Sequence, residues 1–573
     1  MDRVCFLEKA LKKNNGNAQL HVELGAELRR AGHPQKAIEH YREAVRLCPE
    51  AEPLLLAALG VSHKDVGDFD EAIRCFQQAV KICPHDADAW SNLGTLRKNL
   101  NKLEEAEACL REGIKFNPTS APAHNNLGNV YLEQNKTKMA MAHYRRALEI
   151  DSGLFDAHLN MAKCLATMGK NDEAIEQHHR AISADPEQAM GYFGLGTLLL
   201  RLIQWEEAVP EFEKAIELKP DYAQAHANLA TTFINLGRSD DALVSIDRAL
   251  ALDPALVEPQ WNKAVAFLRA GRFKEGWQQH EWRTKLPDYP KRVCSQPLWD
   301  GSLFRDKTLL LLGEQGFGDT IQFSRFARHA KQRGGRVILE CQKELRPLLE
   351  RCEGVDETVL RGEWPVAFDL VFPLLSLPML FEMEEKDFAV PGPYLHVPSE
   401  TSVILSRLDG EESGGTRKLR VGFVWAGSPT HPHDKMRSCP LDFFKRLMQV
   451  HGVRFYSLQK GPAASELASL PTEFGAVNAA DLAHDFAGTA SIILSLDIVI
   501  AVDTSVAHLA GALGKPVWLL LPAVPDWRWM MGRDDTPWYS SMLLFRQKTR
   551  GDWKEVFGRL EVKLREEIGK CSR

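Results

Sequence analysis

The sequence has little excess charge of either sign. Its 71 Lys and Arg residues nearly balance its 77 Asp and Glu residues, which leaves a formal net charge of -6. A chain with this balance has no overall electrostatic attraction to nucleic acid or to an anionic membrane. We therefore expect no nucleic-acid partner, and any anion site must be local.

Long apolar runs are also missing. Charged residues interrupt the first nine positions, at Asp2, Arg3, Glu8 and Lys9, so the N-terminus lacks the apolar core of a signal peptide. No later run reaches the length needed to cross a membrane. These absences predict a cytoplasmic protein with no integral membrane association.

The 11 cysteines form no C-x-x-C pair and no His–Cys cluster at metal spacing. The pattern therefore indicates neither a disulfide framework nor a structural zinc site. We expect most of the cysteines to be small core residues in a reducing compartment, and we expect no metal and no other cofactor.

A length of 573 residues, with 44% apolar and 26% charged residues, is typical of a folded protein with several domains. The first half has a period of 34 residues. A small residue recurs in each predicted first helix, at Gly25, Gly60, Gly94, Gly128, Ala162, Gly196, Ala230 and Ala264. A second series marks the partner helices, at Ala37, Ala72, Ala106, Ala140, Ala174, Ala208, Ala242 and Gly276. Small residues let two helices approach closely, and a proline ends most units, so each unit is predicted to be a helix pair.

This pattern resembles the tetratricopeptide repeat over roughly residues 17–290. The resemblance implies an all-α solenoid of about eight repeats in residues 1–290, with a concave face lined by the first helices.

One position of the first helices carries a ladder of asparagines, interrupted by Gly194: Asn92, Asn126, Asn160, Asn228 and Asn262. Each amide can donate and accept a hydrogen bond, so the ladder is a candidate groove for a peptide or protein partner. Packing that orders the solenoid would explain the same residues equally well. A similar ladder occurs in the repeat domain of protein O-linked N-acetylglucosamine transferases, which favours the peptide interpretation. Two residues earlier stand side chains predicted to face a neighbouring helix: Trp90, His124, His158, Tyr192, His226 and Gln260.

The period changes after a linker at residues 291–306. Short apolar runs then alternate with helical stretches, beginning with residues 309–312, a glycine-rich loop at 313–319 and a further run at 336–340. This β-α-β pattern predicts a parallel sheet, and a second set of runs begins at residue 419. The sequence therefore predicts two α/β domains, residues 307–415 and 416–573, with the turn-forming residues 411–415 between them.

Ligands bind beyond the carboxyl ends of the strands in such sheets. Residues 503–514 follow a predicted strand and open a helix. Thr504 or Ser505 could cap that helix and leave its N–H groups and positive dipole end for a diphosphate. A plain capped helix would have the same pattern.

Four motifs in order resemble the heptosyltransferase-like glycosyltransferases of family 9. They are Gly318 with Asp319, residues 425–429 with 434–440, residues 458–461, and residues 503–505 with His508. The resemblance covers roughly residues 307–550 and is more specific in the second α/β domain than in the first. It implies a GT-B fold of two facing Rossmann-like domains, the first on the acceptor side and the second binding a nucleotide-sugar. It also implies that the sugar is transferred without a metal ion and with inversion of the configuration at its anomeric carbon. The whole chain resembles bacterial repeat proteins fused to such a transferase.

The resemblance also implies roles for single residues. Asp319 falls at the catalytic carboxylate and becomes the candidate general base, although an Asp at a helix start also serves as a cap. Arg437, or else Lys435, falls where the family has a basic residue on the phosphates. Asp503 would bond the hydroxyls of the donor sugar.

The rest of the predicted nucleotide-sugar site comes from the same motifs. Thr504, Ser505 and His508 would form the phosphate- and sugar-binding turn, in which Ser505 replaces the family's usual glycine. Further candidates that could touch the nucleotide-sugar are Gly318, Ser428, Gln459 and Lys460. The Trp- and Arg-rich residues 525–533 either close over the donor or pack the two domains together.

These observations lead to one main hypothesis and two alternatives. The main hypothesis is a metal-independent inverting glycosyltransferase whose solenoid holds a protein or peptide acceptor. The first alternative is a repeat scaffold without catalysis. The second is a transferase that acts on a lipid-linked saccharide or on a lipopolysaccharide core.

Overall fold

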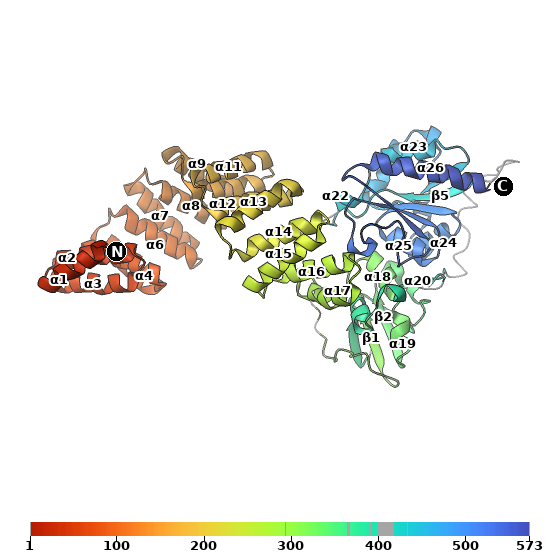
Figure 1. Ribbon diagram of the computed structural model, residues 1–573, viewed down its shortest axis with the longest axis horizontal. Helices are drawn as coiled ribbons and strands as arrows, with labels where there is room; N and C mark the ends of the chain where they lie inside the picture. The colour runs from red at the N-terminus through yellow and green to blue at the C-terminus, as the bar shows by residue number, and fades with distance from the viewer. Residues whose placement is uncertain are drawn as a thin grey trace. The chain divides into compact units, whose positions relative to one another are not determined.

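A computed structural model describes residues 2–290, 292, 294–363, 367–389, 392–397, 418–431 and 434–571. The chain forms two compact units, Met1–Asp221 and Tyr222–Arg573. The predicted turn at 411–415, and with it the expected domain boundary, lies outside the described residues. Figure 1 shows the helix pairs from red to yellow-green and the two sheets in green and blue.

The first unit consists of paired helices, which confirms the repeats predicted there. Helix α1 (Asp2–Lys13) precedes six pairs. These are α2 (Ala18–Arg30) with α3 (Pro34–Leu47), α4 (Glu52–Val66) with α5 (Phe69–Ile82), α6 (Ala87–Asn99) with α7 (Leu103–Phe116), α8 (Ala121–Glu133) with α9 (Thr137–Ile150), α10 (Phe155–Thr167) with α11 (Asn171–Ala184), and α12 (Ala189–Arg201) with α13 (Trp205–Leu218).

The small residues lie where the two helices of a pair are in contact. A Cβ atom on Gly128 would lie 2.5 Å from Cε1 of Tyr144, and one on Gly25 would lie 2.9 Å from Cε1 of Tyr41. The aromatic ring of the second helix occupies the space that a larger side chain would need. This contact explains why glycine or alanine recurs once per repeat.

The residues two positions before the asparagine ladder join the helices of a repeat, as predicted for this position. The ring N–H groups of Trp90 and His124 face the carbonyl oxygens of Pro84 and Pro118, at 2.9 and 3.2 Å. Nδ1 of His124 also lies 3.1 Å from Nδ1 of His143 in the second helix of the same repeat. These side chains connect each first helix to its preceding turn and to its partner helix.

The second unit begins with two more helix pairs and continues into an α/β region. The pairs are α14 (Ala223–Asn235) with α15 (Ser239–Leu252), and α16 (Val257–Arg269) with α17 (Phe273–His280), followed by the 3-10 helix η2 (Glu281–Lys285).

The first sheet has the order β3-β2-β1-β4, and all its pairs are parallel, as the sequence predicts. Its strands are β1 (Thr308–Leu312), β2 (Arg336–Cys341), β3 (Glu357–Leu360) and β4 (Leu370–Pro373). The helices of this region are α18 (Phe317–Ser324), α19 (Ala327–Lys331), α20 (Arg346–Leu349) and α21 (Leu377–Leu380).

The second sheet is also parallel, with the order β10-β9-β8-β5-β6-β7. Its strands are β5 (Leu419–Val424), β6 (Val453–Ser457), β7 (Val477–Asn478), β8 (Ile498–Val502), β9 (Val517–Leu521) and β10 (Met542–Arg546). The helices here are α22 (Asp434–Arg437), α23 (Asp442–Met448), α24 (Phe486–Leu494), α25 (Ser505–Ala512) and α26 (Trp553–Cys571), and the 3-10 helix η11 spans Trp527–Trp529.

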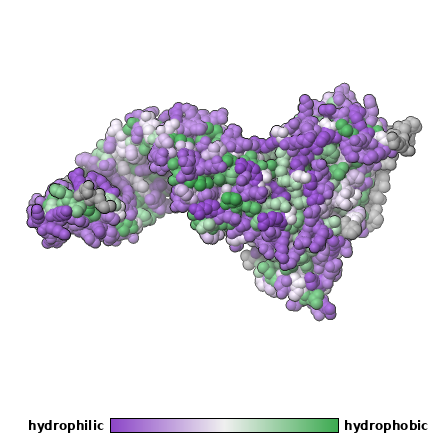
Figure 2. Space-filling model, viewed as in Figure 1, coloured by the Kyte–Doolittle hydropathy of each residue, from purple (hydrophilic) through white to green (hydrophobic). Residues whose placement is uncertain are grey.

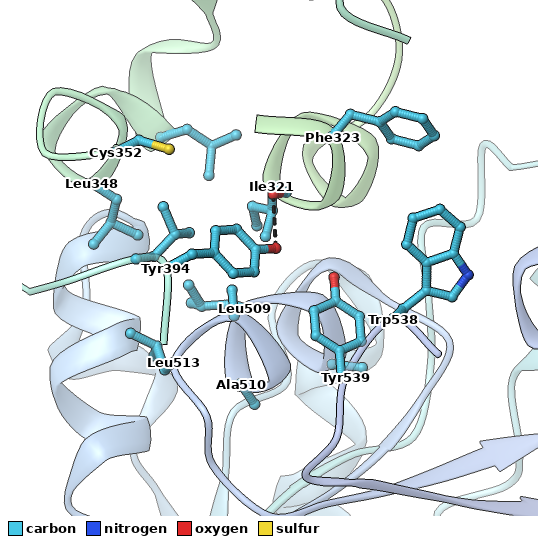
Figure 3. Close-up of a cluster of buried hydrophobic side chains, with 14 of the residues drawn as sticks. Ile321, Phe323, Leu348, Cys352, Tyr394, Leu509, Ala510, Leu513, Trp538 and Tyr539 are labelled. Carbon is cyan, nitrogen blue, oxygen red and sulfur yellow. Dashed lines mark hydrogen bonds between the residues drawn. The ribbon is translucent and has the colours of Figure 1, made fainter. Parts of the chain in front are cut away.

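The two sheet regions share one buried core. Figure 3 shows Ile321 of α18 and Leu509 of α25 on either side of the Tyr394 ring, with Tyr539 to one side. In the space-filling view, hydrophilic side chains cover most of the visible surface (Figure 2). None of the helices in the described ranges is long and apolar enough to cross a membrane.

The last repeat packs into this core through Trp277 of α17. Its indole is 1% exposed and lies edge-on to the rings of Phe323, Phe388 and Trp527 at 5.5 to 6.2 Å. The indole N–H donates to the carbonyl oxygen of Met383 (2.9 Å). The second helix of the last repeat is therefore part of the α/β core.

We expect Trp277→Ala to lower the free energy of unfolding of the second unit by about 3–5 kcal/mol, because it leaves a large cavity and an unpaired carbonyl group. The half-buried Trp282, which lies beside Lys285, offers the matched control Trp282→Ala with a smaller effect. Calorimetry of the full chain measures both. Equal shifts for the two variants would show that Trp277 has no special role in this core.

Candidate functional site

The strand orders indicate where a ligand would bind in each sheet. The order reverses between β1 and β4 in the first sheet, and between β5 and β8 in the second. In open parallel sheets, ligands bind outside the carboxyl ends of the strands at this reversal. The segments that follow β1, β5 and β8 carry three of the four predicted motifs, and the fourth, residues 458–461, follows β6.

Asp319 is placed in the first turn of α18. Its Oδ2 accepts a hydrogen bond from the backbone N–H of Gly316 (2.9 Å), and its Oδ1 accepts one from Nη2 of Arg528. Asp319 therefore caps its helix and also forms an ion pair. Its side chain remains 20% exposed.

Arg528 joins both sheet regions at this point. Its Nε donates to Oε1 of Gln322 in α18 (2.7 Å), and its Nη1 donates to Oδ1 of Asp526 (2.9 Å). Burial opposes the charge, but the carboxylates of Asp526 and Asp319 raise the pKa of Arg528 above its ordinary value. All three guanidinium nitrogens are therefore bound, and Arg528 is a fixed cation beside the candidate base.

The turn after β8 begins with Asp503, whose side chain is 14% exposed. Burial, and then the nearby Asp526, raise the pKa of Asp503 to about 6. Thr504 occupies the N-cap position of α25 as predicted, but its side chain does not cap the helix, because its hydroxyl donates to the carbonyl oxygen of Val502 (3.2 Å). Ser505 is the first residue of the helix.

His508 of α25 lies against the glycine-rich loop of the first sheet. A Cβ atom on Gly318 would lie 2.9 Å from Cδ2 of His508, so only glycine allows this approach. Nε2 of His508 lies 3.7 Å from Oδ1 of Asp503, and Nδ1 lies 2.9 Å from the hydroxyl of Tyr539. The structure thus brings Gly318 and Asp319 together with Asp503 and His508.

Arg437 lies across the loop that follows β5. A Cβ atom on Gly427 would lie 2.6 Å from Nη2 of Arg437 and 2.3 Å from Oδ1 of Asp434, so both side chains lie against this glycine. Nε of Arg437 is 3.4 Å from Oδ1 of Asp434. Burial raises the pKa of Asp503, and the positive charge of Arg437 opposes that rise. Arg437 therefore interacts electrostatically with the turn after β8.

The other predicted residues differ in their surroundings. Lys435 is exposed, and Ser428 is exposed with its hydroxyl bonded to that of Thr430 (2.8 Å). Gln459 is buried and holds the loop after β5: its Oε1 accepts from the N–H groups of Trp425 and Ala426, at 3.1 and 3.0 Å. Its amide nitrogen donates to the carbonyl oxygens of Ala426 and Lys460.

Lys460 is also bound within the protein. Its ammonium group donates to the carbonyl oxygen of Ala483 (2.6 Å), and burial lowers its pKa below the ordinary value. Gln459 and Lys460 therefore order the loops at the edge of the sheet.

Side chains of the Trp- and Arg-rich residues 525–533 pack into the core that both sheet regions share. Trp527, Trp529 and Met530 belong to the shared core. Arg546 donates to the carbonyl oxygens of Trp529 and Met530, at 3.0 and 2.6 Å, and so holds this segment on the second sheet.

Several residues of the site were missed by the sequence analysis. Arg528 lay within a segment singled out for its Trp and Arg content, but its partner Asp319 is 209 positions away. Tyr539 carried no recognisable motif. Glu314, in the glycine-rich loop, accepts from both Arg283 (2.9 Å) and Tyr289, and only the structure reveals this buried contact.

The asparagine ladder links consecutive first helices. In the first unit, the amide nitrogen of Asn126 donates to Thr95 (3.2 Å), and that of Asn160 donates to Asn125 (2.9 Å). The Oδ1 atom of Asn92 accepts from Lys64 (2.9 Å). In the second unit Asn262 donates to Thr231 (2.9 Å), and Asn228 is half-buried.

The ladder is interrupted at Gly194 for a steric reason. A Cβ atom there would lie 2.6 Å from Cε1 of the buried His178.

Within the described ranges, no group of three or more His, Cys, Asp or Glu side chains is arranged to hold a metal ion.

Models of the tetratricopeptide repeat match residues 18–51, 60–101, 96–135, 121–154, 159–223 and 199–268. The chain therefore carries tetratricopeptide repeats. It is similar to Protein FlbA of Caulobacter vibrioides, with 27% identity over 320 residues, which are 51% of this chain and 52% of that protein. The chain thus spans about half the length of this curated relative.

Solved repeat structures are also similar to part of the chain. YrrB, described as a TPR protein with an unusual peptide-binding site, is 23% identical; the match covers 32% of this chain and 95% of YrrB, with a TM-score of 0.27. A tetratricopeptide repeat protein from Parabacteroides merdae is 18% identical over 44% of this chain and 98% of its own, with a TM-score of 0.36.

The raised pKa of Asp503 predicts a pH-dependent stability. The folded protein binds this proton more tightly than the unfolded chain does. The carboxyl group therefore stabilises the fold at low pH, and this contribution is lost as the pH rises from about 4 through about 6. Asp503→Asn lacks the titrating group and should not show this loss. On going from pH 5 to pH 8, the stability of the variant relative to the native chain should therefore rise by on the order of 1–3 kcal/mol. Thermal unfolding at both pH values measures the difference.

The control is Asp442→Asn, because the side chain of Asp442 is 79% exposed. We expect it to behave like the native chain at both pH values. A constant difference between Asp503→Asn and the native chain across this range would contradict the raised pKa.

Proposed function

We propose that the chain is a metal-independent inverting glycosyltransferase with a GT-B fold that moves a sugar from a nucleotide-sugar to a protein or peptide. One observation carries the proposal: the segment after β1 of one parallel sheet meets the turn after β8 of another. Gly318 touches His508 there, and Arg528 stands among Asp319, Asp526 and Asp503. Paired carboxylates beside fixed cations, at the strand-order reversals of both sheets, suit transfer of a group from a diphosphate.

The departing nucleoside diphosphate needs groups that hold negative charge. In the proposed reaction the bond between the anomeric carbon and the phosphate oxygen breaks, and its electron pair goes to the diphosphate. The first N–H groups of α25, which no N-cap side chain satisfies, and the Arg437 guanidinium would bind that charge. Asp503 would accept hydrogen bonds from the hydroxyls of the sugar.

The acceptor hydroxyl needs a base, and we assign that role to Asp319. A carboxylate offers about four lone-pair positions. The N–H of Gly316 takes one position on Oδ2, and Arg528 takes one on Oδ1. The remaining positions of this partly exposed group are available to a hydroxyl, whose proton would pass to Asp319 as its oxygen attacks the anomeric carbon.

The repeats support a protein or peptide acceptor. Asn126, Asn160 and Asn262 each use the amide nitrogen to bond the preceding first helix. Their Oδ1 atoms point to no hydrogen-bond donor that is recorded among the described residues, and the side chains are half-buried. In the first unit, the oxygens of Asn126 and Asn160 would accept hydrogen bonds from the N–H groups of an extended chain of any sequence.

A non-catalytic scaffold remains the second candidate, and a specific observation favours it. Asp319, Gln459 and Lys460 all have partners inside the protein. A site whose polar groups already satisfy one another could serve only to hold the two sheet regions together. Binding of a donor distinguishes the two functions.

The deciding experiment is a thermal-shift screen of the full chain against UDP-glucose, GDP-mannose, ADP-glucose and the three free diphosphates. A ligand that binds only the folded state increases the free energy of unfolding, by about 2.7 kcal/mol when its concentration is a hundred times its Kd. The melting temperature therefore rises. We expect one base to stabilise the chain, Asp503→Ala to weaken that binding at least tenfold, and Asp442→Ala to leave it unchanged. If no ligand shifts the native chain, the scaffold function stands instead.

A second pair of variants tests the base. Asp319→Asn should keep donor affinity and reduce turnover by about a hundredfold or more, because the amide cannot accept the proton. Asp526→Asn also removes a carboxylate from Arg528, so it should destabilise the site comparably while turnover remains measurable. Transfer of radiolabelled sugar, followed beside the melting temperature, separates chemistry from stability. Full turnover in Asp319→Asn would reject the assignment.

A further inference from the structure

The imidazole of His508 is enclosed by elements of both sheet regions. It is 5% exposed, with Gly318 of the first region against its Cδ2 edge and the indole of Trp529 at 5.3 Å. Tyr539 reaches Nδ1 from the other side, because position 511 is glycine: a Cβ atom there would lie 2.6 Å from the Tyr539 ring. Two glycines thus permit one histidine–tyrosine contact.

The enclosed imidazole carries a single proton. Burial, followed by the charges of Arg528 and Arg325, lowers the pKa of His508 to about 3. A neutral imidazole has two tautomers, with the proton on either Nδ1 or Nε2. The groups facing the two nitrogens decide between them.

The hydroxyl of Tyr539 faces Nδ1 at 2.9 Å and lies beside a buried cation. The Arg325 guanidinium lies 4.6 Å from the ring centres of both Tyr539 and Tyr394. Among the described residues, Arg325 has no carboxylate partner: its hydrogen bonds go to the carbonyl oxygens of Gln322, Phe388 and Trp538 and to the hydroxyls of Tyr394 and Tyr539. Burial raises the pKa of Tyr539 well above its ordinary value, and the charge of Arg325 opposes that rise.

The hydroxyl of the neighbouring Tyr394 is hydrogen-bonded to that of Tyr539. Its own proton goes to the carbonyl oxygen of Ile321 (3.0 Å), the bond drawn in Figure 3, where the Tyr394 and Tyr539 rings lie side by side between α18 and α25. Its oxygen accepts from Arg325 (3.0 Å). Because its own proton is used on Ile321, Tyr394 can only accept from Tyr539, so its oxygen and Nδ1 of His508 are the two acceptors open to the Tyr539 proton. The group that faces the opposite nitrogen of His508 decides between them.

The opposite nitrogen of His508 faces a carboxylate. Oδ1 of Asp503 lies 3.7 Å from Nε2. A lone pair on Nε2 would point towards a negative oxygen, whereas an N–H group there would be attracted to it. The carboxylate therefore favours the tautomer with its proton on Nε2, which leaves the lone pair of Nδ1 to accept from Tyr539.

We infer that Tyr539 donates its hydroxyl proton to Nδ1 of His508 and thereby holds the imidazole in the tautomer whose Nε2–H points towards Asp503. Tyr539 is a positioning residue. In the proposed function, on which this part rests, the Nε2–H donates to an oxygen of the nucleotide-sugar beside Asp503. The opposite tautomer would present a lone pair to that oxygen and weaken the donor site.

The test is a spectroscopic one on the full chain, labelled with ring-¹⁵N histidine and measured at pH 7.5. Protonated and unprotonated ring nitrogens differ clearly in chemical shift, and the signals of His508 are identified by their loss in His508→Gln. We expect an unprotonated Nδ1 and a protonated Nε2 in the native chain. A protonated Nδ1 would overturn the inference without any variant.

Two matched variants then remove one buried hydroxyl each. Tyr539→Phe should give a mixed or reversed tautomer, and Tyr394→Phe should leave the native pattern. Retention of the single native tautomer in Tyr539→Phe would also overturn the inference.

The consequence for the donor is measured separately by calorimetric titration with the nucleotide-sugar of the panel above that stabilises the native chain most. We expect Tyr539→Phe to weaken binding about three- to tenfold, as for one lost hydrogen bond, and Tyr394→Phe to leave it unchanged. If the native chain binds none of the panel, the proposed function fails, while the tautomer measurement still decides the role of Tyr539.

Discussion

The ion pairs of one buried guanidinium, that of Arg528, determine how the two sheet regions meet. Its three nitrogens bind Gln322 and Asp319 from the first region and Asp526 from the second. A buried charge that loses one partner costs about 3–5 kcal/mol, because the remaining charge is left without compensation. The network therefore specifies one arrangement of α18 on α25. The contact of Gly318 with His508, and the approach of Asp319 to the turn that begins at Asp503, depend on that arrangement.

The ion pairs of Arg528 also give two carboxylates of the site different surroundings. Asp319 and Asp503 are both partly exposed carboxylates of one site. Asp319 has a cation and a backbone N–H on its two oxygens, whereas burial and the charge of Asp526 dominate the surroundings of Asp503 and raise its pKa. The two carboxylates of the site therefore have different electrostatic surroundings. Glycines at 318, 427 and 511 let the side chains around them come this close.

Local sequence patterns predicted much of this fold, and distant contacts account for what they missed. A period of 34 residues and a small residue in each helix identify helix pairs, because neighbours in the sequence make those contacts. The apolar runs identified the parallel strands, and the motifs at Gly318 and at Asp503 proved to be adjacent. No pattern along the chain could pair Arg528 with Asp319, and no motif marked Tyr539. Gln459 ends a strand at the right edge, but its amide is used by the N–H groups of Trp425 and Ala426, which only coordinates reveal.

The packing of the last repeat has a consequence for how such chains can diversify. Trp277 is buried among aromatic rings of the α/β region, and the neighbouring Arg283 forms a buried ion pair with Glu314. The last two helix pairs belong to the same compact unit as the sheets, which begins at Tyr222. Adding, deleting or exchanging repeats upstream of Tyr222 would therefore leave this core whole. A breakpoint at the apparent end of the helical half would instead divide a single hydrophobic core, and neither product would inherit a complete one.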